Sequence, residues 1–345
     1  MKIRGSKNGV LFLVAVLAFS FVALSGCSKK STVSSVPYPF GDEKLAELKI
    51  QADDWAFIAR EKGWLKETFE QHGIKVTLVQ GTTGNEVQLF SRGDLHIASR
   101  MLYPYLLYRT QGADFMAISV SKHPEPEIAS VMVLADSPYK TFDDLKGKKI
   151  ASWRAGCPYL VLFELAEQRN WVLGKDWTYV NIPTNENKNA LLSKEIDAAS
   201  GHLITNDLAP MLVNGITREI AYPERDSIYI NGGGVTVIFS NAEFARKYPN
   251  IIKAYIALRR SSEAWILANF DEAGAIIEGI TRVPPDVSKL YWQRHGSTWE
   301  SSKLNLATIQ KETKALQDWM VEHGDIAADK QVDMAALFDP QYFLK

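Results

Sequence analysis

Short strands and helices alternate along most of this chain, and that alternation restricts its fold more than any other feature. Apolar or β-branched runs of about five residues are separated by helical patterns, many of which end at glycine. The expected strands cover residues 48–52, 75–80, 95–99, 115–121, 128–134, 149–153, 177–182, 196–200, 216–221 and 235–239. Such a βα order predicts an α/β fold with mostly parallel, doubly wound sheets, because parallel strands need a crossover between them.

A weak internal sequence repeat indicates two similar lobes. Shifting the sequence by 101 positions aligns two windows that both read as strand, helix and strand. The identical pairs are Thr77 with Thr178, Val79 with Val180, Thr83 with Thr184, Ala98 with Ala199 and Ser99 with Ser200. We therefore expect two Rossmann-like lobes that face each other. Residues after 241 read as helices, and we expect these to pack on the first lobe.

These patterns give a set of expected boundaries. Lobe 1 would comprise residues 45–135 together with 235–345, and lobe 2 would comprise residues 136–234. The chain would cross between the lobes at Ala135–Ser137 and again at Ile230–Gly234, where three glycines follow one another. Both crossings are candidate hinges.

The N-terminus has the layout of an export signal. Lys2, Arg4 and Lys7 precede a short apolar run at 10–22, which is too short for a comfortable membrane span. The following Leu-Ser-Gly-Cys resembles a bacterial lipobox, which implies a signal peptide at 1–26, a lipidated Cys27 and a flexible tether at 27–44. An uncleaved anchor or a plain signal peptide are the alternatives. The protein would then be extracytoplasmic and held on a membrane by its lipid.

Composition excludes several classes of function. The formal net charge is −1, and basic residues form no block outside the first residues, so we expect no nucleic-acid partner. With Cys27 used for lipid, Cys157 is the only thiol left for the fold. The six histidines show no metal-binding spacing, and no P-loop or GxGxxG occurs. We therefore expect neither a metal nor a cofactor.

The stretch from Ser137 to Pro158 carries a resemblance to a known family. Its DLKGKK core at 144–149 follows a Ser-Pro-x-Lys-Thr entry and precedes a short strand and a turn of small residues. In this it resembles the solute-binding proteins of ABC importers for aliphatic sulfonates, taurine and nitrate, which have the type II periplasmic binding protein fold. Thr141 is expected to cap a one-turn helix at Phe142–Lys146.

The resemblance implies a function. It implies a binding protein, not an enzyme, that captures a small organic anion such as an alkyl or aryl sulfonate between its lobes. A monomer would deliver this ligand to a permease and its ATPase. A heteroaromatic nutrient, such as a thiamine pyrimidine precursor or riboflavin, and nitrate are alternatives. A relative that makes the thiamine pyrimidine is an enzyme, but its cysteine-rich motif and intracellular location disagree with one mature thiol and an export signal.

Candidate ligand-binding residues follow the expected strands, since open α/β sheets bind ligands beyond the carboxyl ends of their strands. In lobe 1 they are Gln51, Trp55, Thr83, Gly84, Asn85, Ser99 and Arg100. Trp55 would either form an apolar surface beside the ligand or pack as part of its helix. The Thr83–Asn85 turn would hold an oxyanion or merely cap a helix. His96 stands where Asp197 stands in the second lobe, and where related proteins have an acid.

In lobe 2 the candidates are Trp153, Arg154, Ala155, Gly156, Cys157 and His202. Arg154 could hold a sulfonate or carboxylate through two parallel hydrogen bonds, or lie on the surface. Related proteins often have a hydroxyl where this chain has Cys157. At a helix N-terminus the Cys157 thiol should have a lowered pKa. No histidine or acid lies at a recognisable spacing from it, so we expect no catalysis there.

Overall fold

The computed structural model describes residues 40–123, 128–204, 208–296 and 305–343. The signal peptide, Cys27 and most of the tether expected at the N-terminus lie outside these residues. Across the described ranges, no helix is both long enough and apolar enough to cross a membrane.

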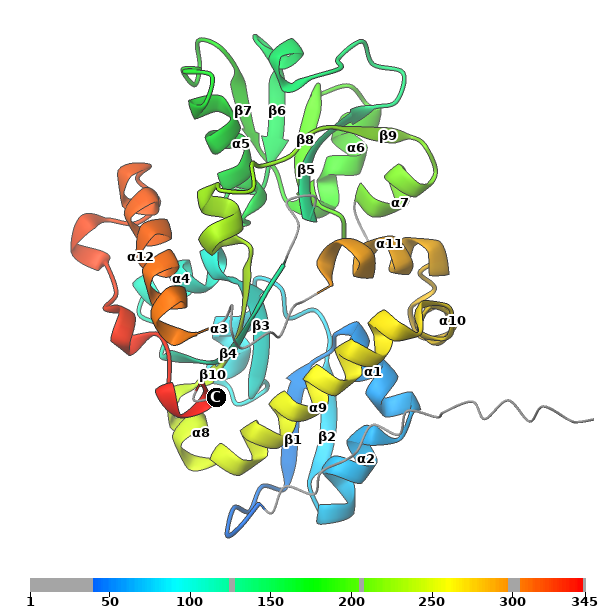
Figure 1. Cartoon of the computed structure of the whole chain (residues 1–345), viewed down its shortest axis with the longest axis vertical. Coiled ribbons are helices and arrows are strands. Elements are labelled where there is room, and N and C mark those ends of the chain that lie inside the picture. Colours follow the sequence, from blue (N-terminus) through cyan, green and yellow to red (C-terminus); the bar gives the residue numbers. More distant parts are fainter. Residues whose placement is uncertain (1–39, 124–127, 205–207, 297–304, 344–345) are drawn as a thin grey trace, which may run out of the picture. The chain divides into compact units, whose positions relative to one another are not determined.

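Two five-stranded sheets form the framework (Figure 1). The first has the order β2-β1-β3-β10-β4 and the second has the order β7-β6-β8-β5-β9. The strands of the first sheet are β1 (Glu47–Gln51), β2 (Lys75–Val79), β3 (Ile97–Met101), β4 (Phe115–Lys122) and β10 (Val235–Asn241). Those of the second are β5 (Ala129–Leu134), β6 (Lys149–Ser152), β7 (Thr178–Asn181), β8 (Ala198–His202) and β9 (Thr217–Ala221). The two equivalent orders confirm the predicted pair of similar α/β lobes.

Each sheet holds one antiparallel strand at the same position. In the first sheet β10 runs antiparallel between β3 and β4, and in the second β5 runs antiparallel between β8 and β9. The remaining pairs that join β1, β2 and β3, and β6, β7 and β8, are parallel. The inserted strands are those that follow the two crossings of the chain.

The position of β5 corrects one expected boundary. We expected residues 128–134 in the first lobe and a crossing at Ala135–Ser137, but β5 pairs with β8 and β9 in the second sheet. The first crossing therefore lies between Lys122 and Ala129. The strand is buried nearly throughout, so its apolar pattern suits either sheet. Its partners lie far along the chain and leave no local signal.

The second crossing agrees with the expected glycine-rich segment. A π-helical turn, η5 (Tyr229–Gly233), leads directly into β10. A Cβ atom on Gly232 would lie 2.9 Å from the carbonyl oxygen of Glu312 in α12 (Leu306–Glu322). Glycine at this position therefore lets the crossing pack directly against the backbone of that helix.

Helices cover both sheets. The short helices α1 (Asp54–Glu61), α2 (Trp64–Thr68), α3 (Glu86–Ser91) and α4 (Leu102–Thr110) belong to the first lobe. Those of the second are α5 (Pro158–Glu167), α6 (Asn187–Leu192) and α7 (Leu208–Val213). The C-terminal helices are α8 (Ala242–Lys247), α9 (Pro249–Ala268), α10 (Phe270–Thr281), α11 (Pro285–His295) and α12. Of these, α9 packs on α1 and α2 as expected, while α11 also contacts α7 of the second lobe.

The predicted one-turn helix is present as the 3-10 turn η3 (Phe142–Leu145). The Asp144 carboxylate accepts hydrogen bonds from the backbone nitrogens of Lys140 and Thr141 at 2.7 and 2.9 Å. Those hydrogen bonds lower the pKa of Asp144. The DLKGKK core is therefore a capped turn that leads into β6.

The same structural task is performed by different residues in the two lobes. In the second lobe, the Asp197 carboxylate accepts a hydrogen bond from the backbone nitrogen of Lys149 at 3.0 Å. In the first lobe, His96 Nδ1 accepts one from the backbone nitrogen of Lys49 at 3.1 Å. Burial lowers the pKa of His96 to about 4, which keeps the ring neutral and able to accept. His96 is thus a structural replacement for the acid and not a ligand group.

Candidate functional site

Polar side chains gather at the carboxyl ends of the parallel strands in both sheets. β1, β3 and β4 end at Gln51, Met101 and Lys122, and β6 and β8 end at Ser152 and His202. This edge is where open α/β sheets bind ligands.

Gln51 and Ser99 form a hydrogen-bonded edge in the first lobe. The Gln51 side chain donates to Asp53 Oδ1 at 2.8 Å and accepts from the backbone nitrogen of Ser99 at 3.0 Å. The Ser99 hydroxyl donates to Asp53 Oδ2 at 3.2 Å. Both predicted residues therefore lie at this edge, but their polar atoms are engaged within the protein.

Trp55 packs inside the first lobe. Its side chain is 2% exposed and meets the ring of Tyr255 edge-on, with centroids 5.3 Å apart. The Arg259 guanidinium lies 5.7 Å from the Trp55 ring centroid. Of the two interpretations of Trp55, the structure therefore has the packed one, because the ring is part of the core.

The Thr83–Asn85 turn lies near the second lobe. All three of its residues are exposed, and Asn85 Nδ2 donates to the carbonyl oxygen of Gly81 at 3.0 Å. Gly84 has a φ of +81°, which favours glycine, and a Cβ there would lie 3.9 Å from Trp153 Cη2. The structure thus brings together two of the predicted segments from opposite lobes.

Arg100 is an ion-paired residue at this edge. Its Nε lies 3.3 Å from Oε1 of Glu86, whose side chain is fully buried. The hydroxyl of Tyr108 donates to the other Glu86 oxygen at 2.8 Å. The positive charge of Arg100 is therefore partly compensated by Glu86 before any ligand binds.

Arg154 forms the corresponding pair in the second lobe. Its Nε and Nη2 donate to Asp325 Oδ1 at 3.1 and 2.9 Å. The Asp325 side chain is 2% exposed, whereas that of Arg154 is 52% exposed. Because Asp325 follows α12, this ion pair connects the C-terminal region to the second lobe. Arg154 is therefore neither a bare surface residue nor an unpaired anion-binding group.

A pocket of about 430 Å³ lies beside this ion pair. Its lining combines aromatic, cationic and acidic groups from both lobes. The lining residues are Tyr103, Leu107, Trp153, Arg154, Ala155, Asn181, Gly324 and Asp325. Gly156 closes the turn behind it by donating its backbone N–H to the carbonyl oxygen of Trp153 at 2.9 Å.

Cys157 and His202 are in direct contact. Cys157 Sγ lies 2.7 Å from His202 Nε2, and His202 Nδ1 lies 3.3 Å from the carbonyl oxygen of Ile128. A proton on Nδ1 that points to this carbonyl leaves Nε2 to accept from the thiol. The two side chains are 45 positions apart along the chain, which explains why spacing alone did not indicate the pair.

The thiol is not activated, which corrects our expectation of a lowered pKa. Burial raises the pKa of Cys157 to about 12, and the nearby Arg100 only partly opposes this. Burial also lowers the pKa of His202 to about 4. Desolvation outweighs the helix N-terminus here, so the pair consists of a neutral thiol and a neutral imidazole.

Two further histidines that we did not predict as site residues extend from His202: His295 contacts it, and His123 contacts His295. The centroid of the His295 ring lies 5.7 Å from that of His202 and 5.4 Å from that of His123. His123 directly follows β4, so its place at a strand end could have identified it. His295, at the end of α11, carries no such signal. No three acidic, histidine or cysteine side chains within the described ranges are placed to hold a metal ion.

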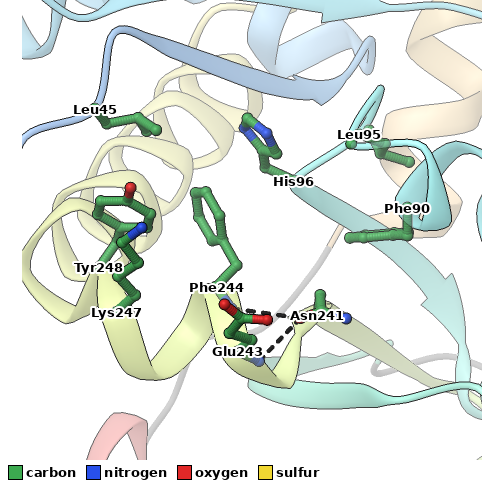
Figure 2. A pocket seen from close by; sticks show the side chains of 10 residues that line it. Leu45, Phe90, Leu95, His96, Asn241, Glu243, Phe244, Lys247 and Tyr248 are labelled. Atoms are coloured by element: carbon green, nitrogen blue, oxygen red, sulfur yellow. Dashed lines mark hydrogen bonds between the residues drawn. The ribbon is translucent and has the colours of Figure 1, made fainter.

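A second pocket, of about 290 Å³, lies at the opposite edge of the first sheet (Figure 2). Figure 2 shows Asn241 at the start of α8, where its side chain accepts hydrogen bonds from the backbone nitrogens of Glu243 and Phe244. The ring of Phe244 stacks on that of His96. These contacts stabilise the fold, and the pocket is remote from the strand ends that carry the predicted residues.

Comparisons with known proteins fit this arrangement. The family model described as NMT1/THI5 like matches residues 55–273. A candidate aliphatic sulfonates-binding protein of Bacillus subtilis (strain 168) is 24% identical over 350 aligned residues, which cover 98% of this chain and 96% of that protein.

Solved structures show the same fold. The alkanesulfonate-binding protein of Xanthomonas axonopodis pv. citri, bound to MOPS, matches with a TM-score of 0.71 and 16% identity over 86% of this chain and 99% of its own. The periplasmic aliphatic sulphonate binding protein of Escherichia coli matches with a TM-score of 0.69 and 17% identity over 85% and 92%. At such low identity, the likeness establishes the two-lobed fold of periplasmic binding proteins.

Proposed function

This chain belongs to the NMT1/THI5-like family, and we propose that within it the chain is an extracytoplasmic solute-binding protein of an ABC importer. Its ligand is a small organic anion of the alkyl or aryl sulfonate class. The observation that carries this proposal is the end-to-end match, at 24% identity, to a candidate aliphatic sulfonates-binding protein.

The geometry supports a ligand held between the two lobes. Thr83–Asn85 and Arg100 would approach it from the first lobe, and Trp153–Cys157 and His202 from the second. The Thr83–Asn85 turn supplies exposed polar groups, and Trp153 supplies an aromatic surface opposite Gly84. Gln51 and Ser99 would shape the edge behind the ligand. A head group with several oxygens suits such a set of donors.

Anchoring and delivery complete the proposal. Lipid on Cys27 would hold the protein at the outer side of a membrane, where the closed, ligand-bound monomer would dock on a permease powered by an ATPase. The protein itself would bind and release its ligand without catalysing a reaction. The neutral state of the Cys157 thiol supports a binding role.

A heteroaromatic ligand is the second candidate, and one observation favours it. Arg154 is paired with the buried Asp325, while Trp153 and Tyr103 line the same pocket. A flat ring of the thiamine-precursor or flavin type could stack on these aromatic groups without needing a free cation. Nitrate would make little use of them.

The test is a binding panel with two variants that should act in opposite directions. Protein lacking residues 1–27 is titrated with ethanesulfonate, taurine, a pyrimidine, riboflavin and nitrate, and tryptophan fluorescence and heat are recorded. We expect sulfonates to bind. Glu86→Gln, which removes the carboxylate that competes for Arg100, should strengthen sulfonate binding by up to about tenfold, and Arg100→Gln should weaken it by a similar factor.

Arg169→Ala is the matched control, because Arg169 pairs with the exposed Asp143 away from the strand ends. It should leave the dissociation constants unchanged. Binding of the pyrimidine or riboflavin alone would favour the second candidate. If no compound of the panel bound, the assignment as a binding protein for these ligands would be wrong.

A further inference from the structure

An anion buried at this edge would need a positive charge that is not already neutralised. Three arginines on elements around this edge, Arg100, Arg259 and Arg294, are each paired with a carboxylate within the protein. These pairs are Arg100 with Glu86, Arg259 with Glu263 and Asp53, and Arg294 with Glu219. Burying an extra negative charge among balanced pairs is costly, so the proposed ligand needs a further source of positive charge.

A cluster of three histidines, His123, His202 and His295, offers that source. His295 is the central ring, because it contacts both of the others. Its Nε2 is buried without a hydrogen-bond partner among the described residues, and so is His123 Nδ1. Both nitrogens of His202 are occupied by Cys157 and by the carbonyl of Ile128. His295 is therefore the ring with the most freedom to bind a proton and donate it to a ligand.

The groups around the histidine cluster come from several elements. Arg100 of β3 lies near His202, Arg259 of α9 lies near His123, and Arg294 lies beside His295 in α11. Among the residues that the structure describes, the other titratable side chains in contact with these histidines are neutral. They are Cys157 at the start of α5, Tyr229 of η5, whose ring meets that of His202 and whose backbone nitrogen donates to Glu164, and Tyr291 of α11, whose ring stacks on His295.

This environment keeps the rings neutral while no anion is bound. Burial lowers the pKa of His123 to about 3 and that of His202 to about 4, and burial together with the other two histidines lowers the pKa of His295 well below its usual value. The nearby arginines act in the same direction. A bound anion would reverse the balance, since a negative charge within hydrogen-bonding distance stabilises imidazolium.

We infer that the histidine cluster, and His295 above all, contacts the anionic head group, and that the ligand binds together with a proton. This inference rests on the proposed function and adds His123 and His295 to the ligand-binding residues. The charge of the sulfonate would be compensated by a proton taken from solution, while the arginine pairs stay intact.

The sign of the pH dependence follows from linkage. The relevant pKa is low in the free protein and raised in the complex, so the complex binds more protons. Affinity is therefore greatest at acid pH and falls as the pH rises towards the pKa of the complex. For one coupled proton the slope reaches about tenfold per pH unit.

The test uses the full chain in detergent solution and ethanesulfonate, which stays ionised at every pH used. Its dissociation constant is measured from pH 5 to pH 8, and proton uptake is obtained at pH 6 from calorimetry in two buffers with different ionisation enthalpies. We expect uptake approaching one proton and affinity that weakens with rising pH. His295→Gln should weaken binding at pH 6 and flatten the slope.

His96→Gln is the matched control, because His96 also has its pKa lowered to about 4 but lies at the opposite edge of the first sheet. It should keep both the affinity and the slope of the wild type. Binding that is independent of pH and takes up no proton would overturn the inference while leaving the proposed function intact. Absence of sulfonate binding at every pH would overturn both.

Discussion

Single residues show how one task can be done with different chemistry. His96 and Asp197 occupy equivalent places in the two lobes, and each accepts a hydrogen bond from the backbone nitrogen of a residue in a neighbouring strand. The imidazole accepts only while it is neutral, which its burial ensures at ordinary pH. A carboxylate accepts over a wider range of pH.

This equivalence makes a prediction at the scale of the residue. His96→Asp should keep the acceptor for the Lys49 N–H and lose little stability, whereas His96→Ala should leave that N–H without its partner and cost about 1–3 kcal/mol. Urea unfolding at pH 7 measures both. Equal losses in the two variants would show that the packing of the ring on Phe244 matters, and not the hydrogen bond.

The sequence pattern predicted which residues lie at the candidate site, but not which of them contact each other. The strand ends placed Arg100, the 153–157 turn and His202 at one edge, because the alternation of strands and helices is a local pattern. It could not reveal that Cys157 contacts His202, or that Arg154 pairs with Asp325, since both contacts join segments far apart in the chain. It also predicted the wrong direction for the pKa of the Cys157 thiol, because burial depends on residues that only the folded chain brings together.

At the scale of elements, α12 contacts segments that lie far apart in the chain. It packs on α4 of the first lobe and on η5 at the second crossing. Near its end, the ring of Trp319 lies against that of Tyr159 in α5, and His323 Nε2 contacts the carboxylate of Glu167. This helix therefore contacts elements of both lobes, which the expected packing on the first lobe did not include.

The close approach of η5 to α12 yields a prediction for one glycine. Gly232→Ala would force a methyl group against the backbone of Glu312 and should destabilise the protein by about 1–3 kcal/mol. Gly279→Ala is the matched control, because Gly279 lies in α10 and a Cβ added there would have no atom within 4 Å. It should instead stabilise by about 0.5–1 kcal/mol. Thermal unfolding of both variants decides, and a neutral Gly232→Ala would contradict the packing argument.

The strand order of the fold was less predictable than its class. The α/β class and the two lobes follow from local alternation and from the repeat at a spacing of 101. The place of β5 in the second sheet does not, because an antiparallel strand buried on both faces has the same apolar pattern in either sheet. The pairing is decided by contacts with β8 and β9.

For the whole molecule, the pH dependence of stability should contain a distinct contribution from Glu164. Its side chain is 7% exposed and accepts from the backbone nitrogen of Tyr229 at 3.1 Å. Burial raises its pKa to about 7. Because the pKa of Glu164 is higher in the folded state than in the unfolded chain, its contribution to stability is fully present below the unfolded pKa. This contribution is lost as the pH rises through the folded pKa, near 7.

Glu164→Gln removes that ionisation but keeps an acceptor for Tyr229. We expect the variant to gain stability relative to the wild type between pH 5 and pH 8, by up to a few kcal/mol. Glu61→Gln, at an exposed position of α1, is the control and should show no comparable gain with pH. Chemical unfolding at a series of pH values tests this, and parallel curves for wild type and Glu164→Gln would contradict it.

The place of β10 has a consequence for the order in which the chain can fold. β3 ends at Met101 and its neighbour β10 begins only at Val235, after the whole second lobe. Until β10 arrives, β3 and β4 have no strand between them, and closing so long a loop is slow. The second sheet needs no later strand and can form first. A chain synthesised from its N-terminus would therefore keep its first lobe open until the residues after the second lobe have been made.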